Sequence, residues 1–144
     1  MGFPYQHNLI KYFIGLMNSS ISELFLEILA PTLDFNLVSM KQIPMKVDCV
    51  QEVTTLVEEC INLSKRDWDS YEISWEFSKH PFIGTYRLIE DAYSHWKEVC
   101  DSSFMHLKDN EERLNRIFSQ IYGLDGLVEC TVSEENVTVR RAEL

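Results

Sequence analysis

The chain lacks the short motifs that commonly announce chemistry on nucleotides, metals or thiols. Five glycines are scattered along 144 residues and form no glycine-rich phosphate loop, and the GLDG sequence (123–126) is predicted to be a helix-terminating turn instead. Four cysteines contain no CxxC pair, and no histidine stands at the spacing of zinc ligands. We therefore expect reduced thiols, no metal site, and the cytoplasm as the location of the protein.

Long apolar runs are also missing. No stretch approaches the roughly 18 apolar residues that a membrane-spanning helix needs, and the start of the chain lacks a charged segment followed by an apolar run. We expect neither a signal peptide nor a membrane partner.

Basic residues are few, because 13 Lys and Arg face 23 Asp and Glu and give a formal net charge of −10. The charges of residues 1–46 cancel, so the excess acidity lies in residues 47–144. Proteins that bind nucleic acid usually carry a basic surface that neutralises phosphates. DNA binding is therefore expected to be weak at most, with Lys41, Gln42 and Lys46 as the candidate contacts and solvated loop residues as the alternative.

Candidate catalytic groups do not converge. His95 lies four residues after Asp91 on a predicted helix, which is typical of a solvated surface pair. Adjacent carboxylates such as Glu58 and Glu59 point about 100° apart on a helix, so they do not share one ligand. We predict no catalytic residue, no cofactor-binding residue, and no enzyme activity of the chain on its own.

The pattern that is present is helical. Apolar spacing predicts two short helices that meet near Ser20, where Glu23 completes a capping box, and a third helix over 47–63. Ser64 is predicted to begin a separate short helix, and loose alternation predicts a small extended or β element near residues 34–46. The fold class is therefore mainly α, as a helical bundle or hairpin, with a further short strand considered around Val137 and Val139.

One long amphipathic helix dominates residues 83–122. At about 1.5 Å per residue it would reach roughly 60 Å, which is long for a compact domain of this size. The stripe is interrupted over 109–112, where we predict a weak point or a bend. Its apolar face, carried by Trp96, Leu107, Leu114 and Phe118, is predicted to be a docking surface that is partly exposed or covered by self-association. The aromatic run that includes Trp68 and Trp75 is expected to pack internally.

Three phrases together resemble one family. The spaced pattern that starts at Gly15-Leu-Met-Asn-Ser and ends at Ile43-Pro44, with Pro31, Thr32 and Phe35 between, is similar to the end of a target recognition domain in DNA adenine methyltransferases. The phrase LSKRDWDSYEISWEFSKHP (63–81) resembles a segment of the large BREX phage-defence methyltransferases, the PglX family. The phrases LKDNEERLNRIFSQIYGLDG (107–126) and TVRRAEL (138–144) resemble two further segments of the same family.

The resemblance implies a parent enzyme that uses S-adenosylmethionine to methylate adenine in DNA. The glycine motif and the Asn-Pro-Pro-Tyr-type motif of that chemistry are absent, since no Asn-Pro pair occurs in the chain. We expect a non-catalytic, internal or truncated piece, with residues 1–46 as the end of a target-recognition-like region. Residues 47–144 would be one acidic helical spacer that packs against other parts of a methyltransferase. The alternative is a stand-alone interaction protein that docks onto a full-length methyltransferase or another defence component.

Overall fold

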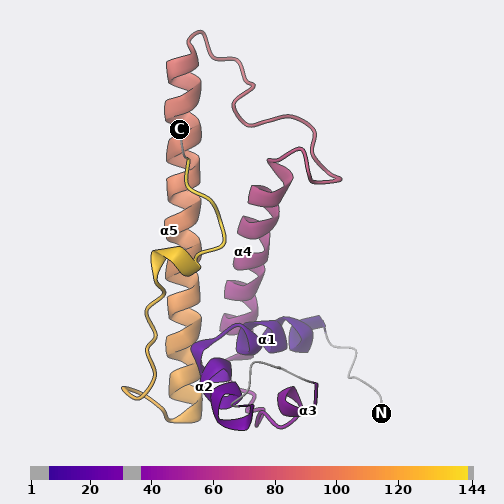
Figure 1. Cartoon of the computed structure of the whole chain (residues 1–144), viewed down its shortest axis with the longest axis vertical. Helices are drawn as coiled ribbons and strands as arrows, with labels where there is room; N and C mark the ends of the chain where they lie inside the picture. Colours follow the sequence, from indigo (N-terminus) through magenta and orange to yellow (C-terminus); the bar gives the residue numbers. More distant parts are fainter. Residues whose placement is uncertain (1–6, 31–36, 143–144) are drawn as a thin grey trace. The chain divides into compact units, whose positions relative to one another are not determined.

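The computed structural model describes residues 7–30 and 37–142, and they form helices joined by irregular segments (Figure 1). The α-helices are α1 (His7–Met17), α2 (Ser20–Leu29), α3 (Leu37–Met40), α4 (Val50–Asp69) and α5 (Ile89–Tyr122), followed by the 3-10 turn η1 (Glu134–Asn136). The predicted mainly helical class and the long amphipathic helix are confirmed.

The small extended element predicted near residues 34–46 is not found in the described part of the chain. Residues 37–40 are helical as α3, and residues 44–49 have no regular structure. Residues 34–36 lie outside the described residues. Ile43, Met45 and Val47 alternate with polar residues or proline, but Met45 and Val47 are exposed and the described ranges offer no strand with which this segment could pair.

The chain divides into two compact units that both use α4 and α5. Unit 1 comprises Met1–Glu58 and Glu111–Thr131, and unit 2 comprises Glu59–Asn110 and Val132–Leu144. Unit 1 has five Lys and Arg against ten Asp and Glu, and unit 2 has eight against thirteen, so each has a formal net charge of −5. The charge boundary after residue 46 therefore lies inside unit 1, and the functional roles predicted for residues 1–46 and 47–144 stay predictions.

Unit 1 packs around Tyr12 and Phe118, which are fully buried and meet edge to face with ring centroids 5.4 Å apart. In Figure 1, α1 crosses the lower turns of α4 at a steep angle. Gly15 allows the close approach, because a Cβ built there would lie 2.7 Å from Cγ2 of Val57. The helix–helix contact thus depends on the missing side chain at residue 15.

The start of α2 is capped from another part of the chain. The predicted boundary between two helices is confirmed. The capping box predicted for Ser20 and Glu23 is wrong, because Ser20 is already the first residue of α2 and the N-cap is Ser19, which makes no side-chain cap bond. Its hydroxyl instead donates to the Leu16 carbonyl oxygen at 2.7 Å. The amide of Ser20 donates to Oδ1 of Asn115 at 3.0 Å, and Nδ2 of Asn115 donates to the Cys130 carbonyl oxygen at 3.3 Å.

The end of α5 matches the helix-terminating turn expected of the GLDG sequence. Gly123 has φ of +69°, and its amide donates to the Gln120 carbonyl oxygen at 3.0 Å. The amide of Leu124 donates to the Ser119 carbonyl oxygen at 2.9 Å. This pair of bonds is the Schellman arrangement, in which glycine supplies the left-handed residue.

Unit 2 has a small apolar core to which the C-terminal tail contributes. Leu63 of α4, Phe104 and Leu107 of α5, and Val137 and Val139 of the tail form one buried cluster. The separate helix predicted from Ser64 is wrong, since α4 continues to Asp69 without a break. The strand considered at 137–139 is also absent, although both valines are buried as their alternation suggested.

α5 is continuous through residues 109–112, so the predicted interruption does not break it. Asn110 is buried at 7% exposure, and its Nδ2 donates to Oε2 of Glu59 at 3.0 Å. His106 Nε2 lies 3.3 Å from the same carboxylate oxygen. The polar residue in the stripe is therefore accommodated by a partner on α4, and the division between the two units falls directly after it.

Within the described ranges, no single helix is both long enough and apolar enough to cross a membrane. α1 from Leu9 and α2 satisfy the same criteria only when taken together, as a pair bent by 66°.

Candidate functional site

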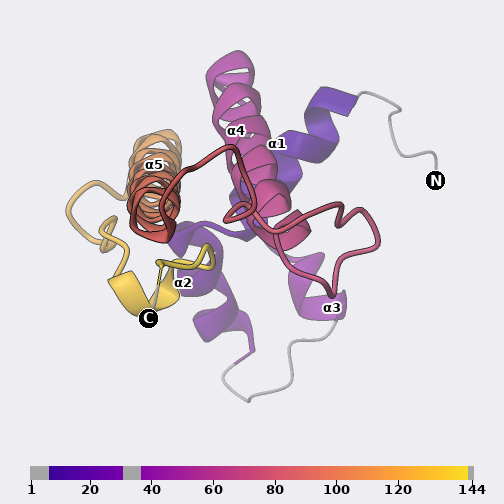
Figure 2. The same ribbon diagram turned by 90° about the horizontal axis from the view of Figure 1, so that it is seen from above.

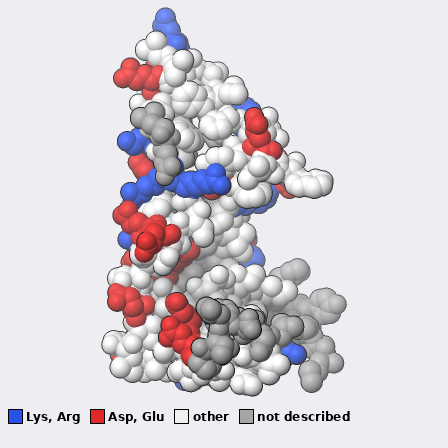
Figure 3. Space-filling view, in the orientation of Figure 1, with Lys and Arg blue, Asp and Glu red and all other residues white. Residues whose placement is uncertain are grey.

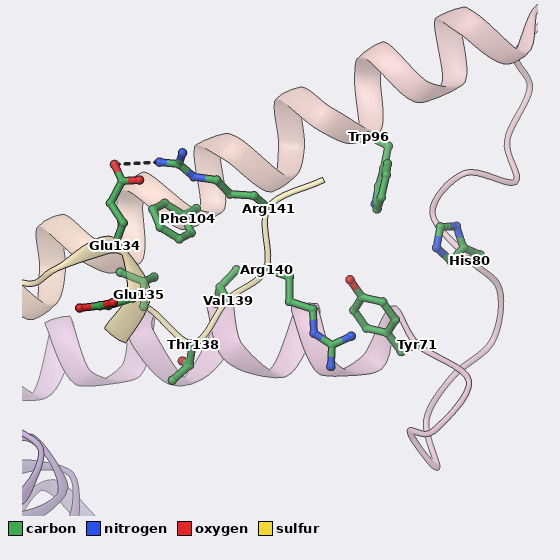
Figure 4. Close-up of a pocket in the computed structure, with 11 residues that line it drawn as sticks. Tyr71, His80, Trp96, Phe104, Glu134, Glu135, Thr138, Val139, Arg140 and Arg141 are labelled. Carbon is green, nitrogen blue, oxygen red and sulfur yellow. Dashed lines mark ion pairs between the residues drawn. The ribbon is translucent and has the colours of Figure 1, made fainter. Parts of the chain in front are cut away.

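The site that the structure offers is a cavity of about 580 Å³ in unit 2, here called the tail cavity (Figure 4). Side chains from the loop after α4, from α5 and from the C-terminal tail (132–142) surround it. Its lining residues are Tyr71, His80, Trp96, Phe104, Glu134, Glu135, Val137, Thr138, Val139, Arg140 and Arg141. Aromatic rings, two guanidinium groups and two carboxylates thus share one hollow.

The tail places its side chains by alternation. Val137 and Val139 are buried in the core of unit 2, whereas Thr138 and Arg140 are exposed. The amide of Arg140 donates to Oδ1 of Asp67 at 3.4 Å, which fixes the tail against the last turn of α4. Burial raises the pKa of the Asp67 carboxyl, while this bond and the charge of Arg140 act in the opposite direction.

Each arginine lies over an aromatic ring. The guanidinium carbon of Arg140 is 4.3 Å from the ring centroid of Tyr71, and that of Arg141 is 4.1 Å from the centroid of Phe104. Arg141 also pairs with Glu134 at 3.2 Å. Stacking of this kind orients a guanidinium group without removing its in-plane N–H donors.

A cluster of rings holds Trp96 at the mouth of the tail cavity. Its ring centroid lies 5.7 Å from that of His80, 6.3 Å from that of Phe82 and 6.0 Å from that of Tyr93. The amide of Phe82 donates to Nδ1 of His80 at 3.1 Å, so the neutral imidazole has its proton on Nε2 and can donate there. Trp96 is only partly buried.

Figure 2 shows the path of the loop that follows α4. A polar network fixes the start of this loop. Lys65 pairs with Asp69 at 2.7 Å and also with Glu76. The hydroxyl of Ser74 donates to Oδ1 of Asp69 at 2.6 Å and accepts from the amide of Glu76 at 3.1 Å. The bonds from Lys65 and then Ser74 hold the pKa of Asp69 below its usual value. The segment from Asp69 to Glu76 therefore forms a defined turn.

The residues predicted to contact DNA lie in unit 1, and one of them, Lys46, is already bonded within that unit. Nζ of Lys46 donates to the Ile121 carbonyl oxygen at 3.4 Å and lies 5.5 Å from the ring centroid of Tyr122. The ammonium group of Lys46 therefore binds at the C-terminal end of α5, where a positive charge is favourable. Lys41 and Gln42 are exposed. Figure 3 shows acidic and basic side chains interspersed on the visible face, with no continuous basic surface there.

The predicted docking stripe is largely internal. Leu107, Leu114 and Phe118 are 1%, 6% and 0% exposed, so these three side chains leave little surface for a partner, and the docking role of the stripe stays a prediction. Leu107 packs with the tail in the core of unit 2, and Phe118 packs against Tyr12 in unit 1. Trp96 alone of the four is partly exposed, and it lines the tail cavity.

The aromatic run after α4 also differs from its prediction. Trp68 is 52% exposed and Trp75 is fully exposed, although both were expected to pack internally. In this segment the buried side chain is that of Ser74, which bonds to Asp69. Its apolar neighbours Ile73 and Trp75 therefore point to solvent and not into the core. Large apolar side chains are therefore exposed where the sequence predicted a core.

The residues present do not fit the glycine loop that the resemblance implies for S-adenosylmethionine. Gly15 lies inside α1 against Val57, and Gly123 and Gly126 follow the end of α5. Each of these glycines thus has a packing or turn role. The described ranges also contain no cluster of His, Cys, Asp and Glu that could hold a metal ion.

Sequence reasoning missed the two arginines as site residues. Arg140 and Arg141 were recognised only as part of the TVRRAEL phrase. The available signal was the alternation of Val137 and Val139 with polar residues, which indicates that one side of the tail faces a core and the other faces solvent. Nothing in the sequence pattern indicated that Trp96 and His80 would meet that outer side.

No protein-family model matches the chain. It is 34% identical over 148 residues to the adenine-specific methyltransferase PglX of Lacticaseibacillus casei (strain Zhang), covering 99% of this chain and 12% of that protein. It is 27% identical over 126 residues to the adenine-specific methyltransferase BrxX of Escherichia coli O9:H4 (strain HS), covering 88% of this chain and 10% of that protein. The chain corresponds to a segment of the PglX family. It therefore spans about a tenth of the length of these relatives.

Proposed function

We propose that the chain is a non-catalytic, cytoplasmic segment of a PglX-type adenine-specific methyltransferase that packs against the rest of such a protein and supports its target recognition. Catalysis and the methyl donor would belong to other parts of the protein. The observation that carries the proposal is the exposure of large apolar side chains on both units. Exposed apolar surface of this kind marks interaction sites.

The first exposed surface is one face of α1. Ile10, Phe13 and Ile14 are 54%, 44% and 39% exposed and follow the i, i+3, i+4 spacing of one helix face. The opposite face of the same helix is used by Tyr12 and Leu16, which are buried in unit 1. α1 is therefore apolar on two sides, as expected of a helix that lies between two layers.

The second exposed surface is formed by the last turn of α4 and the turn that follows it. Trp68, Ile73 and Trp75 are exposed, although the network of Lys65, Asp69 and Ser74 fixes the backbone around them. Loose packing therefore does not explain their exposure. Tryptophan is enriched at the anchoring centres of protein interfaces, so a partner that covers Trp75 fits this turn.

The supporting role in target recognition would be indirect. Each unit has a formal net charge of −5, and unit 1 pairs Lys11 with Glu58 and Arg113 with Glu52. A surface of this kind gives little of the counterion release that drives DNA binding. Lys41 and Gln42 remain the proposed points of weak DNA contact, and the other contacts would come from the rest of the methyltransferase.

A hybrid protein tests the packing role. We would replace the matching segment of the L. casei relative with this chain and measure soluble yield, melting temperature and adenine methylation of cellular DNA. Substituting Trp75→Ser with Ile73→Ser should lower all three. Leu127→Ser is the matched control, because Leu127 is 77% exposed but lies outside both exposed surfaces.

Two outcomes would count against the proposal. The first is a hybrid that stays inactive and insoluble with the unaltered chain. The second is a Trp75 and Ile73 variant that behaves like the Leu127 control. Capture of the full-length relative by the isolated chain, again through Trp75, would instead support the alternative of a stand-alone docking protein.

A further inference from the structure

We propose that the tail cavity is a nucleotide-binding site, with a base stacked between Trp96 and Tyr71 and a phosphate held by Arg140. The proposal concerns unit 2 alone and does not depend on the packing role proposed above. The ligand chemistry is a planar heteroaromatic ring that carries one phosphate. A free mononucleotide and an unpaired nucleotide of a DNA strand both provide it.

The size and the aromatic lining of the cavity suit a planar ring. Figure 4 shows Tyr71 and Trp96 pointing toward one another from two different segments, with His80 beside them. The volume of about 580 Å³ falls within the range of roughly 300–1,000 Å³ that is typical of small-molecule sites. Stacking of bases on aromatic side chains is a general mode of binding to unpaired nucleotides.

The polar groups around the rings are suitable donors. His80 accepts the amide of Phe82 at Nδ1, so its Nε2–H is left to donate to a base edge. Thr138 lines the same cavity from the tail and can donate or accept through its hydroxyl. A base inserted between the rings would therefore find hydrogen-bonding groups at its rim.

The two arginines are not equivalent. Arg141 pairs with Glu134, whereas no ion pair between side chains is found for Arg140 among the described residues. The Tyr71 ring orients the Arg140 guanidinium, and the bond from its backbone amide to Asp67 fixes its position in the tail. Arg140 is therefore preorganised to donate to an oxyanion, which is the role that a phosphate-binding arginine needs.

The charge of the surroundings limits the ligand to one or a few phosphates. Glu134 and Glu135 line the other end of the cavity, and unit 2 has a formal net charge of −5. A duplex would bring many phosphates against this acidic surface without a matching number of cations. The site should consequently prefer a mononucleotide or a short unpaired strand to duplex DNA.

Calorimetric titration of the full chain tests this assignment. The probes are deoxyadenosine monophosphate, a ten-nucleotide single strand and the corresponding duplex. Arg140→Gln and Trp96→Leu should each weaken binding of the first or second probe about tenfold. Arg87→Gln and Tyr86→Leu are the matched controls, because both residues are exposed and lie outside the lining of the tail cavity.

A salt titration adds a readout that a merely structural change would not produce. For the single strand, Arg140→Gln should reduce the slope of log K against log salt by about one phosphate contact, whereas Trp96→Leu should leave the slope unchanged. Binding of the mononucleotide identifies a free nucleotide as a ligand, and binding of the strand alone identifies unpaired DNA. The proposal is overturned if neither probe binds, if only the duplex binds, or if both variants bind like their controls.

Discussion

Unit 1 and unit 2 use the same two long helices in different ways. In unit 1, α1 packs against α4 at Gly15 and against α5 through the ring pair of Tyr12 and Phe118. The side-chain amide of Asn115 on α5 bonds to two distant backbone segments. In unit 2 the two long helices are covered by a tail whose outer side lines a cavity with charged and aromatic groups. The same two helices thus take part in one closely packed unit and in one unit that contains a cavity.

The sequence phrases that resemble the PglX family have different structural roles in the two units. Asn115 and Phe118 belong to the phrase 107–126 and act in the packing of unit 1. Arg140 and Arg141 belong to the phrase TVRRAEL and line the tail cavity. Changes in unit 1 should therefore alter stability alone, whereas changes around the tail cavity should also alter binding.

The largest effect is expected from truncating the buried phenylalanines of α5. Phe118→Ala should lower the free energy of unfolding by about 3–5 kcal/mol, since it removes the ring that packs against Tyr12. Phe104→Ala should cost a similar amount because Phe104 is 4% exposed in the core of unit 2. Urea denaturation followed by circular dichroism measures both.

The milder changes Phe118→Leu and Phe104→Leu separate stability from binding. Each should cost about 1 kcal/mol. Only Phe104 lines the tail cavity, so only Phe104→Leu should weaken binding of a nucleotide there. If the two variants lost binding equally, the functional distinction between the units would be wrong.

Asn115→Ala should have an intermediate effect, lowering the free energy of unfolding by about 1–3 kcal/mol. The substitution leaves the buried amide of Ser20 and the carbonyl of Cys130 without their side-chain partner. Gln120→Ala, an exposed residue on the same helix, is the control and should change stability little. Equal stabilities for the two variants would show that Asn115 does not connect these segments.

Sequence reasoning could predict the features that depend on local pattern. The spacing of apolar residues identified the helices, and the GLDG sequence identified the end of α5, because both follow from backbone geometry and from the ease with which glycine adopts positive φ. The same periodicity identified Leu107, Leu114 and Phe118 as one stripe. It could not show whether that stripe faces solvent or a core, since periodicity is identical in both cases.

The features that were missed depend on contacts between distant residues. The cap of α2 comes from Asn115, which lies 95 residues further along the chain, and no local rule relates the two positions. Trp96 and Arg140 likewise meet only because the tail returns to α5. The mistaken core role of Trp75 has the same origin, since the buried position in that turn is taken by Ser74 through its bond to Asp69.

The smallest effect is expected at Glu111, the first residue of α5 in unit 1 after the division. Burial raises the pKa of its carboxyl above the ordinary value for glutamate. The folded state therefore keeps the proton over a range of pH in which the unfolded state has lost it. Stability associated with this group is present below the ordinary pKa and is lost as the pH rises through the raised pKa.

Glu111→Gln removes that loss, because a glutamine has no charge to bury. The variant should melt at a higher temperature than the original chain near pH 7, and the difference should shrink as the pH is lowered toward the ordinary pKa of glutamate. Glu98→Gln is the matched control, since it changes the net charge equally at an exposed position of the same helix in unit 2. A difference in melting temperature that is the same for both variants at every pH would trace the effect to net charge, because burial distinguishes Glu111 from Glu98 and net charge does not.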